Sequence, residues 1–387
     1  MEKPTKLEYI PKGFRTFSTN CGIKDDSSDL GVVFSERMAN AAALFTRNAV
    51  VGEPIKVGKK HIVDGKLQAI VVNSKNANVA TGKQGYEKSL SICEKIATEI
   101  AIPVDSVLPS STGVISRQLP VEKVLNALDN LSSNLSEEAD FVAFSKSIMT
   151  TDTFPKFVSA KVGNASIVGV AKGSGMIEPN MATMLSYFFT DAELPSDFLH
   201  ETLQECADKS FNCLSVDTDT STSDTLVIMA NGLAGAVDKR EFKKVFLDLC
   251  VQLTCYLARD GEGATKLFKV TVENASTAEE ARRVGKSIIN SPLVKTMIYR
   301  GDPNWGRVLM AIGKTDNYTG NPDLINLHWG ENSEVKMTDS EAVLSKYLTD
   351  NEVIHLAVDL QNGSCSEQSY GCDLTEEYVK IIAYYTT

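Results

Sequence analysis

The chain has 387 residues, of which 43% are hydrophobic and 23% are charged, so it can bury a sizeable core and is not expected to be disordered. Its formal net charge of −11 argues against a nucleic-acid partner, because binding to phosphate backbones requires clustered Lys and Arg. The sequence has no apolar run of about 18 residues, and therefore no membrane span is expected.

Strand-like and helix-like segments alternate along the chain. Three short apolar runs predict buried strands, at residues 67–72, 166–170 and 225–230. Helical spacing predicts five helices, at residues 87–100, 121–131, 197–210, 241–258 and 277–289. Asp238 and either Ser276 or Thr277 are the expected N-caps of the last two helices. Surface loops are expected at residues 25–29 and 315–320. The interleaving of strands and helices predicts a layered α/β architecture.

Eight cysteines are spread from Cys21 to Cys372, and none forms a C-x-x-C pair. This spacing argues against zinc-ribbon and thioredoxin-like sites. Cys250 and Cys255 lie in an apolar helical stretch, where buried thiols are expected. The N-terminus lacks the apolar region of a signal peptide, and free thiols are typical of reducing compartments. The expected location is therefore the cytoplasm.

The four histidines do not suggest a catalytic base. His61 follows two lysines, His200 lies in a predicted helix, and His355 alternates within a strand-like run; the fourth is His328. None has a glycine-rich context, so each is interpreted as structural or exposed. A Ser-His-Asp or Cys-His mechanism needs a histidine base and is therefore disfavoured.

The segment from Lys172 to Leu185 offers a nucleophile that needs no histidine. It places Thr183 after Ala182, where a proline-marked turn meets an apolar stretch. Attack of the Thr183 hydroxyl on the preceding carbonyl would move the acyl group from nitrogen to oxygen. Hydrolysis of this ester by water would separate the chain and leave an N-terminal threonine with a free α-amine. The α-amine of such a threonine has an ordinary pKa of about 8 and can act as base for its own hydroxyl. The alternative interpretation is a glycine turn between a strand and a core segment.

The same segment, Lys-Gly-Ser-Gly-Met-Ile-Glu-Pro-Asn-Met-Ala-Thr-Met-Leu, resembles the cleavage signature of the ornithine acetyltransferases, or glutamate N-acetyltransferases. Further matches to this family follow in order along nearly the whole chain, at residues 76–82, 111–115, 149–153, 216–222, 260–266 and 302–307. The resemblance implies an α/β/β/α-like layered core, similar to that of self-cleaving aminopeptidases, with a smaller C-terminal α/β lobe. It also implies cleavage into an N-terminal segment 1–182 and a C-terminal segment 183–387, assembled as a heterotetramer of two copies of each.

The resemblance implies roles for individual residues. Thr183 would carry the acetyl group as an ester in a ping-pong cycle, and Thr112 and Gly113 would form the oxyanion hole. Since a lysine suits a substrate carboxylate and a glutamate suits an amino group, substrate contacts are implied for Thr150, Lys172, Glu262 and Thr387, in addition to Thr183. No metal and no redox cofactor is implied.

The implied reaction moves an acetyl group from N-acetylornithine, or a related N-acetylated basic amino acid, to glutamate. An N-terminal-nucleophile amidohydrolase or aminopeptidase acting on N-acyl amino acids is the alternative, in which water removes the acyl group. A non-enzymatic protein that only binds a small amino acid is a third possibility. Whether acetyl-CoA also serves as a donor stays open.

The C-terminus departs from the family pattern. The family commonly has an asparagine five residues before its terminal Thr or Ser, and this chain has Ile382 at that position. Isoleucine offers no side-chain hydrogen bond, so a changed substrate preference is expected. Residues 220–225, 230–235 and 370–376 resemble members of the family found in specialised-metabolite clusters, such as those of clavam pathways.

Overall fold

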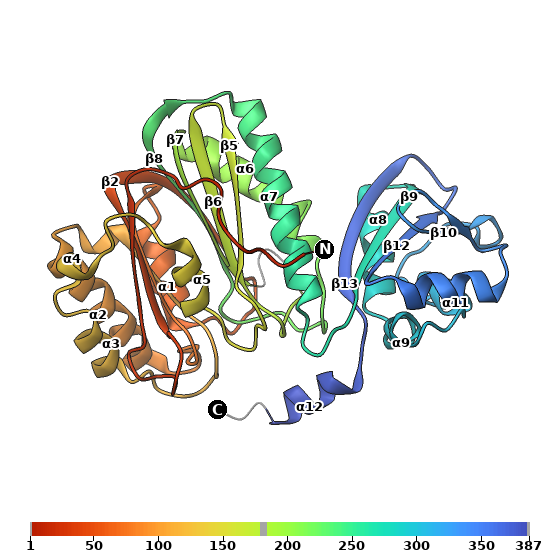
Figure 1. The fold of residues 1–387 in the computed structure, drawn as a ribbon, viewed down its shortest axis with the longest axis horizontal. Coiled ribbons are helices and arrows are strands. Elements are labelled where there is room, and N and C mark those ends of the chain that lie inside the picture. The colour runs from red at the N-terminus through yellow and green to blue at the C-terminus, as the bar shows by residue number, and fades with distance from the viewer. Residues whose placement is uncertain (1, 179–183, 385–387) are drawn as a thin grey trace.

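The structure is a computed structural model that describes residues 2–178 and 184–384. It consists of a large lobe and a smaller C-terminal lobe, each with its own sheet (Figure 1). The strands of the large lobe are β1 (Phe14–Thr19), β2 (Leu30–Phe45), β3 (Lys66–Asn73), β4 (Val107–Ser111), β5 (Lys156–Val162), β6 (Ala165–Lys172), β7 (Leu185–Glu193) and β8 (Thr225–Ala236). Its α-helices are α1 (Glu53–His61), α2 (Gly82–Ile100), α3 (Val121–Ala127), α4 (Leu131–Asn134), α5 (Phe141–Ser147), α6 (Ser196–Asp208) and α7 (Lys239–Arg259).

The large sheet has the order β4-β3-β2-β8-β7-β6-β5, with β1 paired to β2, and it folds over on itself. The long strand β2 makes this possible, because it pairs with β3 mainly through its first half and with β8 through its second half. The pairing with β3 shifts register between Phe34 and Ala39. The two halves of the sheet face each other across one buried cluster, which includes Val33, Ile70, Val170 and Phe189.

Helices cover both outer faces of the folded sheet. α1, α2 and α3 pack against the half formed by β2, β3 and β4, whereas α6 and α7 pack against the half formed by β5 to β8. Each large apolar side chain that becomes fully buried in these layers contributes about 1.5–3 kcal/mol. The layers therefore follow the order α/β/β/α, and the predicted fold is confirmed.

The small lobe contains the strands β9 (Leu267–Ala275), β10 (Asn326–Trp329), β11 (Val335–Lys336), β12 (Val353–Asp359) and β13 (Cys365–Cys372). Its sheet has the order β11-β10-β12-β9-β13. The helices α8 (Ala278–Ile289), α9 (Pro292–Arg300), α10 (Gly306–Gly313) and α11 (Glu341–Asp350) enclose a separate core.

After β13 the chain returns toward the large lobe, where it forms α12 (Glu376–Tyr384; Figure 1). The Thr375 hydroxyl donates to the Gly263 carbonyl at 2.7 Å. A β-carbon on Gly263 would lie 2.5 Å from the Tyr378 nitrogen. The last helix is thereby seated on the loop that follows α7.

Most of the predicted elements are confirmed. β3, β6 and β8 contain the three predicted strands. Asp238 caps α7, accepting hydrogen bonds from the nitrogens of Arg240 and Glu241, and Thr277 caps α8. The single helix predicted at 121–131 is wrong, because the chain takes a left-handed turn at Asn130 (φ 59°) between α3 and α4. Cys250 and Cys255 are buried, as expected.

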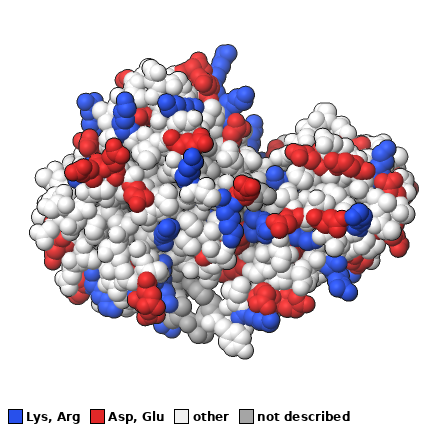
Figure 2. Space-filling view, viewed as in Figure 1, with Lys and Arg blue, Asp and Glu red and all other residues white. Residues whose placement is uncertain are grey.

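No helix in residues 2–178 and 184–384 is long and apolar enough to cross a bilayer. Figure 2 shows acidic and basic side chains interspersed over most of the face viewed.

Candidate active site

β6 and β7 are antiparallel neighbours that flank the predicted cleavage site. Lys172 at the end of β6 pairs in register with Leu185 at the start of β7. Residues 179–183, which include Ala182 and Thr183, lie outside the described residues, as does Thr387. The predicted roles of these three residues therefore stay predictions.

A small cavity of about 20 Å³ lies where these two strands meet, which is room for about one water molecule. Its wall includes Thr112, Lys172, Met184 and Asp224. The Met184 carbonyl accepts a hydrogen bond from the Thr225 nitrogen at 3.0 Å, which ties this edge of the cavity to β8. Two predicted site residues, Thr112 and Lys172, thus share a cavity with Met184, the residue that follows Thr183 in the sequence.

Thr112 and Gly113 form a tight turn directly after β4. The Thr112 nitrogen donates to the Asn73 carbonyl at 3.0 Å, and the side chain is 6% exposed. Its hydroxyl has no hydrogen-bond partner among the described residues, so it is available as a donor in the cavity. Gly113 has a φ of 131°, and a β-carbon there would lie 2.2 Å from the Lys75 carbonyl carbon. Only glycine fits this position, and the turn can serve as the predicted oxyanion hole.

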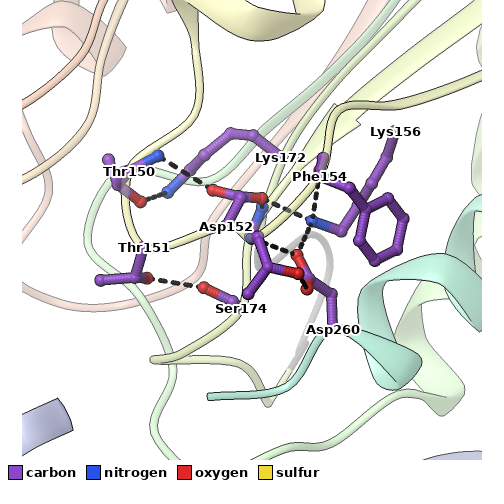
Figure 3. Close-up of polar contacts among 10 residues, drawn as sticks. Thr150, Thr151, Asp152, Phe154, Lys156, Lys172, Ser174 and Asp260 are labelled. Atoms are coloured by element: carbon purple, nitrogen blue, oxygen red, sulfur yellow. Dashed lines mark hydrogen bonds and ion pairs between the residues drawn. The ribbon is translucent and has the colours of Figure 1, made fainter. Parts of the chain in front are cut away.

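Lys172 is held by a hydrogen bond from its Nζ to the Thr150 Oγ1 at 3.1 Å (Figure 3). Burial lowers the pKa of Lys172, and the nearby carboxylates of Asp152 and Asp224 oppose that shift. Asp152 fixes the backbone on both sides of this contact, because it accepts hydrogen bonds from the nitrogens of Thr150 (2.9 Å) and Gly173 (2.7 Å). Lys172 and Thr150 therefore form one prearranged cationic and polar pair.

A buried network of ion pairs holds Asp152, and through it this pair, in place (Figure 3). The Nζ of Lys156 lies 2.6 Å from Asp152 Oδ1 and 2.6 Å from Asp260 Oδ2. Although burial opposes ionisation of Asp152, the positive charges of Lys156 and Lys172 hold its pKa well below the ordinary value. The network joins β5, the end of β6 and the loop after α7.

The sequence analysis missed the three residues of this network. Asp152 and Asp260 lie within the segments 149–153 and 260–266 that carried the family resemblance, and this could have marked them. Nothing in the local sequence marks Lys156, which starts an ordinary strand.

Glu262 lies against the loop that follows β6. Its nitrogen donates to the Ser174 carbonyl at 2.8 Å, and a β-carbon on Gly175 would lie 2.0 Å from Glu262 Oε2. This oxygen is buried and has no hydrogen-bond partner among the described residues. Burial raises the pKa of Glu262, and the charge of Asp217 acts in the same direction. Oε2 of Glu262 is thus available to a cationic substrate group, whose positive charge would lower the pKa of this carboxyl group again.

Contacts from elsewhere in the fold hold the chain that leads to the predicted cleavage site. Asp217 accepts hydrogen bonds from the nitrogens of Met176 (2.6 Å) and Ile177 (2.8 Å). Glu178 Oε2 accepts one at 2.7 Å from the Nδ2 of Asn290, which ends α8 of the small lobe. Neither Asp217 nor Glu178 was predicted as a site residue.

Ile382 lies on α12 and is 44% exposed. Among the described residues that line the small cavity there is no histidine. Among the described residues, no group of three or more His, Cys, Asp or Glu side chains could hold a metal ion.

Comparisons with known proteins find relatives that match nearly the whole chain. Arginine biosynthesis bifunctional protein ArgJ 2 of Clostridium acetobutylicum is 45% identical over 383 residues, covering 97% of this chain and 98% of the relative. Glutamate N-acetyltransferase Oat2 of Streptomyces clavuligerus is 41% identical over 387 residues, with the same coverage.

Among solved structures, ornithine acetyltransferase from Mycobacterium tuberculosis, complexed with ornithine, is 29% identical, with a TM-score of 0.40. That match covers 44% of this chain and 94% of the solved chain. A family model, described as the ArgJ family, matches residues 15–387. The chain therefore belongs to the ArgJ family.

Proposed function

We propose that this protein is an acetyltransferase that moves an acetyl group from N-acetylornithine, or a related N-acetylated basic amino acid, to glutamate. The observation that carries the proposal is the Lys172–Thr150 pair, which lies beside the cavity that Lys172 shares with Thr112 and Met184. The names of the relatives, which are a bifunctional protein of arginine biosynthesis and a glutamate N-acetyltransferase, support the same reaction.

In the proposed cycle, the Thr183 hydroxyl attacks the acetyl carbonyl of the donor, and the α-amine of Thr183 takes up the hydroxyl proton. Thr112 and Gly113 stabilise the negative oxygen of the tetrahedral intermediate. The C–N bond then breaks, the proton passes to the leaving amine, and an acetyl-Thr183 ester remains. The amino group of glutamate then attacks the ester carbonyl and loses a proton to the α-amine of Thr183. The C–O bond of the ester breaks, the Thr183 oxygen takes up that proton, and N-acetylglutamate leaves.

Three of the predicted contacts suit the substrates in this cycle. A protonated Lys172, together with the Thr150 hydroxyl, would hold the α-carboxylate that both amino acids carry. Glu262, whose Oε2 has no partner among the described residues, would face the side-chain amine of the basic donor. Thr387 is proposed as a further substrate contact from the C-terminus.

Self-cleavage between Ala182 and Thr183 is the proposed activation step. Its products, 1–182 and 183–387, would remain associated, because β6 and β7 lie side by side in one sheet and belong to different products. β2 and β8 are also paired across the two products. Assembly of two copies of each product and a cytoplasmic location are further parts of the proposal, supported by the resemblance to the family.

The replacement of the family asparagine by Ile382 supports an altered preference for the amino-acid part of the donor. A family asparagine at this position would offer a donor and an acceptor, and isoleucine offers neither. We expect N-acetylated amino acids with shorter or less polar side chains to be accepted more readily than in family members that have asparagine.

Intact mass spectrometry of the wild-type protein beside Thr183→Ala tests the nucleophile. The expected result is two fragments, 1–182 and 183–387, in the wild type and one full-length chain in the variant. Incubation of the wild type with N-acetylornithine should add one acetyl group to the 183–387 fragment.

The acceptor is tested by adding labelled glutamate and following N-acetylglutamate and free acetate. Transfer to glutamate supports the proposal, and release of acetate without transfer would support the amidohydrolase instead. One uncut chain in both proteins would contradict self-cleavage as the activation step.

A further inference from the structure

We propose that a second cavity, lined by Lys24 and Lys75, binds the side-chain carboxylate of the acidic acceptor. This inference rests on the proposed function, in which one nucleophile serves a basic donor and an acidic acceptor. Glu262 suits the first side chain and would repel the second, because like charges in a partly buried site are costly. An acidic side chain therefore needs a different, positively charged region near the same Lys172–Thr150 pair.

The cavity has a volume of about 600 Å³ and is hollowed beside the candidate active site. Thr150 connects the two, because it lines this cavity and also accepts the hydrogen bond from Lys172. Three lysines contribute to the wall: Lys24, Lys75 and Lys146. A dicarboxylate whose α-carboxylate lies at Lys172 and Thr150 can extend its second carboxylate into this cavity.

Lys75 has a backbone conformation that is unusual for a residue other than glycine. Its φ of 75° lies in the left-handed region, which costs conformational energy for a residue other than glycine. Its carbonyl oxygen accepts a hydrogen bond from the Val114 nitrogen at 3.0 Å, and its backbone packs directly against Gly113. The backbone of Lys75 is thus fixed to the predicted oxyanion turn. Its ammonium group has no hydrogen bond or ion pair with any described residue and remains available to a ligand.

Lys24 supplies a second positive charge in a fixed place. Its Nζ donates to the Met149 carbonyl at 2.7 Å and to the Ser28 carbonyl at 3.1 Å. Burial lowers the pKa of Lys24, and the positive charges of Lys172 and Lys75 act in the same direction, against Asp29 and Asp152. Mutual repulsion among these ammonium groups would be relieved by a bound anion.

The acidic residues of the cavity wall do not cancel this charge. Both carboxylate oxygens of Asp152 are already occupied, by the Nζ of Lys156, the Gly173 nitrogen and the Thr150 nitrogen. Asp25 and Asp26 are exposed on the loop after Lys24, where solvent screens their charges. The three lysines of the cavity wall, Lys24, Lys75 and Lys146, therefore keep positive charges that these carboxylates do not neutralise.

Lys75→Gly tests the proposal without damaging the turn, because glycine adopts a positive φ at no steric cost. Binding of L-glutamate and L-glutamine to the purified wild type and variant would be measured by isothermal titration calorimetry. We expect the variant to bind glutamate at least about tenfold more weakly, as for loss of one charge-assisted contact, and to bind glutamine as the wild type does. Lys161→Ala, which removes an exposed lysine of β5, is the control and should change neither affinity.

The proposal would be overturned if the ratio of the affinities for glutamate and glutamine were the same in Lys75→Gly as in the wild type. This holds even if acetyl transfer to glutamate is observed. If the variant loses glutamate binding but the wild type transfers no acetyl group to glutamate, the proposed function fails and the carboxylate site stands. A wild type that binds neither amino acid would overturn the carboxylate site, whereas the proposed function would still be decided by acetyl transfer to labelled glutamate.

Discussion

The Nζ of Lys156 lies 2.6 Å from Asp152 Oδ1, and both side chains are completely buried. A second carboxylate, that of Asp260, holds the same ammonium group at 2.6 Å. Asp152 in turn positions Thr150 and Gly173 through their backbone nitrogens. The geometry around Lys172 therefore depends on an ion network that never reaches the solvent.

Asp152→Asn should destabilise the protein strongly. The variant leaves Lys156 with one carboxylate in a buried environment, and breaking a buried ion pair typically costs about 3–5 kcal/mol. The free energy of unfolding in urea would measure this loss. Lys346→Ala is the matched control, since it breaks the exposed Lys346–Asp350 pair, and no measurable change is expected. Equal stability of Asp152→Asn and wild type would contradict a structural role for the network.

The same carboxyl group predicts how stability depends on pH. The charges of Lys156 and Lys172 outweigh burial and hold the pKa of Asp152 below its ordinary value of 3.8. A depressed folded-state pKa contributes stability above the unfolded-state pKa, and this contribution is lost as pH falls toward the folded-state pKa.

The wild type should therefore lose free energy of unfolding as the pH decreases below about 5, and Asp152→Asn should lose less over the same range. Urea unfolding at several pH values would compare the two slopes. Parallel slopes would show that other carboxyl groups dominate acid unfolding.

Gly113→Ala should abolish most acetyl transfer. Its β-carbon would lie 2.2 Å from the Lys75 carbonyl carbon, so the turn must shift, and loss of an oxyanion-hole donor typically lowers kcat by about 10²–10³. Steady-state transfer to glutamate would measure the effect. Gly163→Ala is a suitable control, because this glycine also has a positive φ (54°) but has open space around it. Its activity should match the wild type, and an equal loss in both variants would point to a general folding defect.

Asn290→Ala should slow self-cleavage without unfolding the protein. Asn290 donates to Glu178 Oε2 at 2.7 Å, and Glu178 lies four residues before Ala182 in the chain. Without this hydrogen bond, the side chain of Glu178 would hold the backbone ahead of the cleavage site less firmly. The fraction of uncut chain after purification, followed over time by mass spectrometry, measures the rate. Asn351→Ala removes a comparable side-chain hydrogen bond on the surface and should process at the wild-type rate. Processing of Asn290→Ala at the wild-type rate would show that self-cleavage does not depend on this contact from the small lobe.

The sequence determined the features that depend on short stretches of chain. Periodicity placed β3, β6, β8 and most of α6, α7 and α8, because a strand or an amphipathic helix reveals its buried face within a few residues. The residues Lys172 to Leu185 likewise marked the end of β6 and, through the family resemblance, the predicted nucleophile. The single helix predicted at 121–131 was wrong because Asn130 adopts a left-handed conformation, which interrupts helical hydrogen bonding. The spacing of apolar residues carries no information about such a conformation.

Only the tertiary structure decided which distant residues complete the site. Lys156 and Asp260 are 104 residues apart in the chain, and their pairing arises because β5 and the loop after α7 meet at the end of β6. The return of α12 to the loop at Gly263 and the contact between Asn290 and Glu178 have the same origin. Such contacts depend on how layers pack, and a buried charge is tolerated only where the fold brings it a partner. For this reason neither the ion network nor the lysine-lined cavity could be predicted from local sequence.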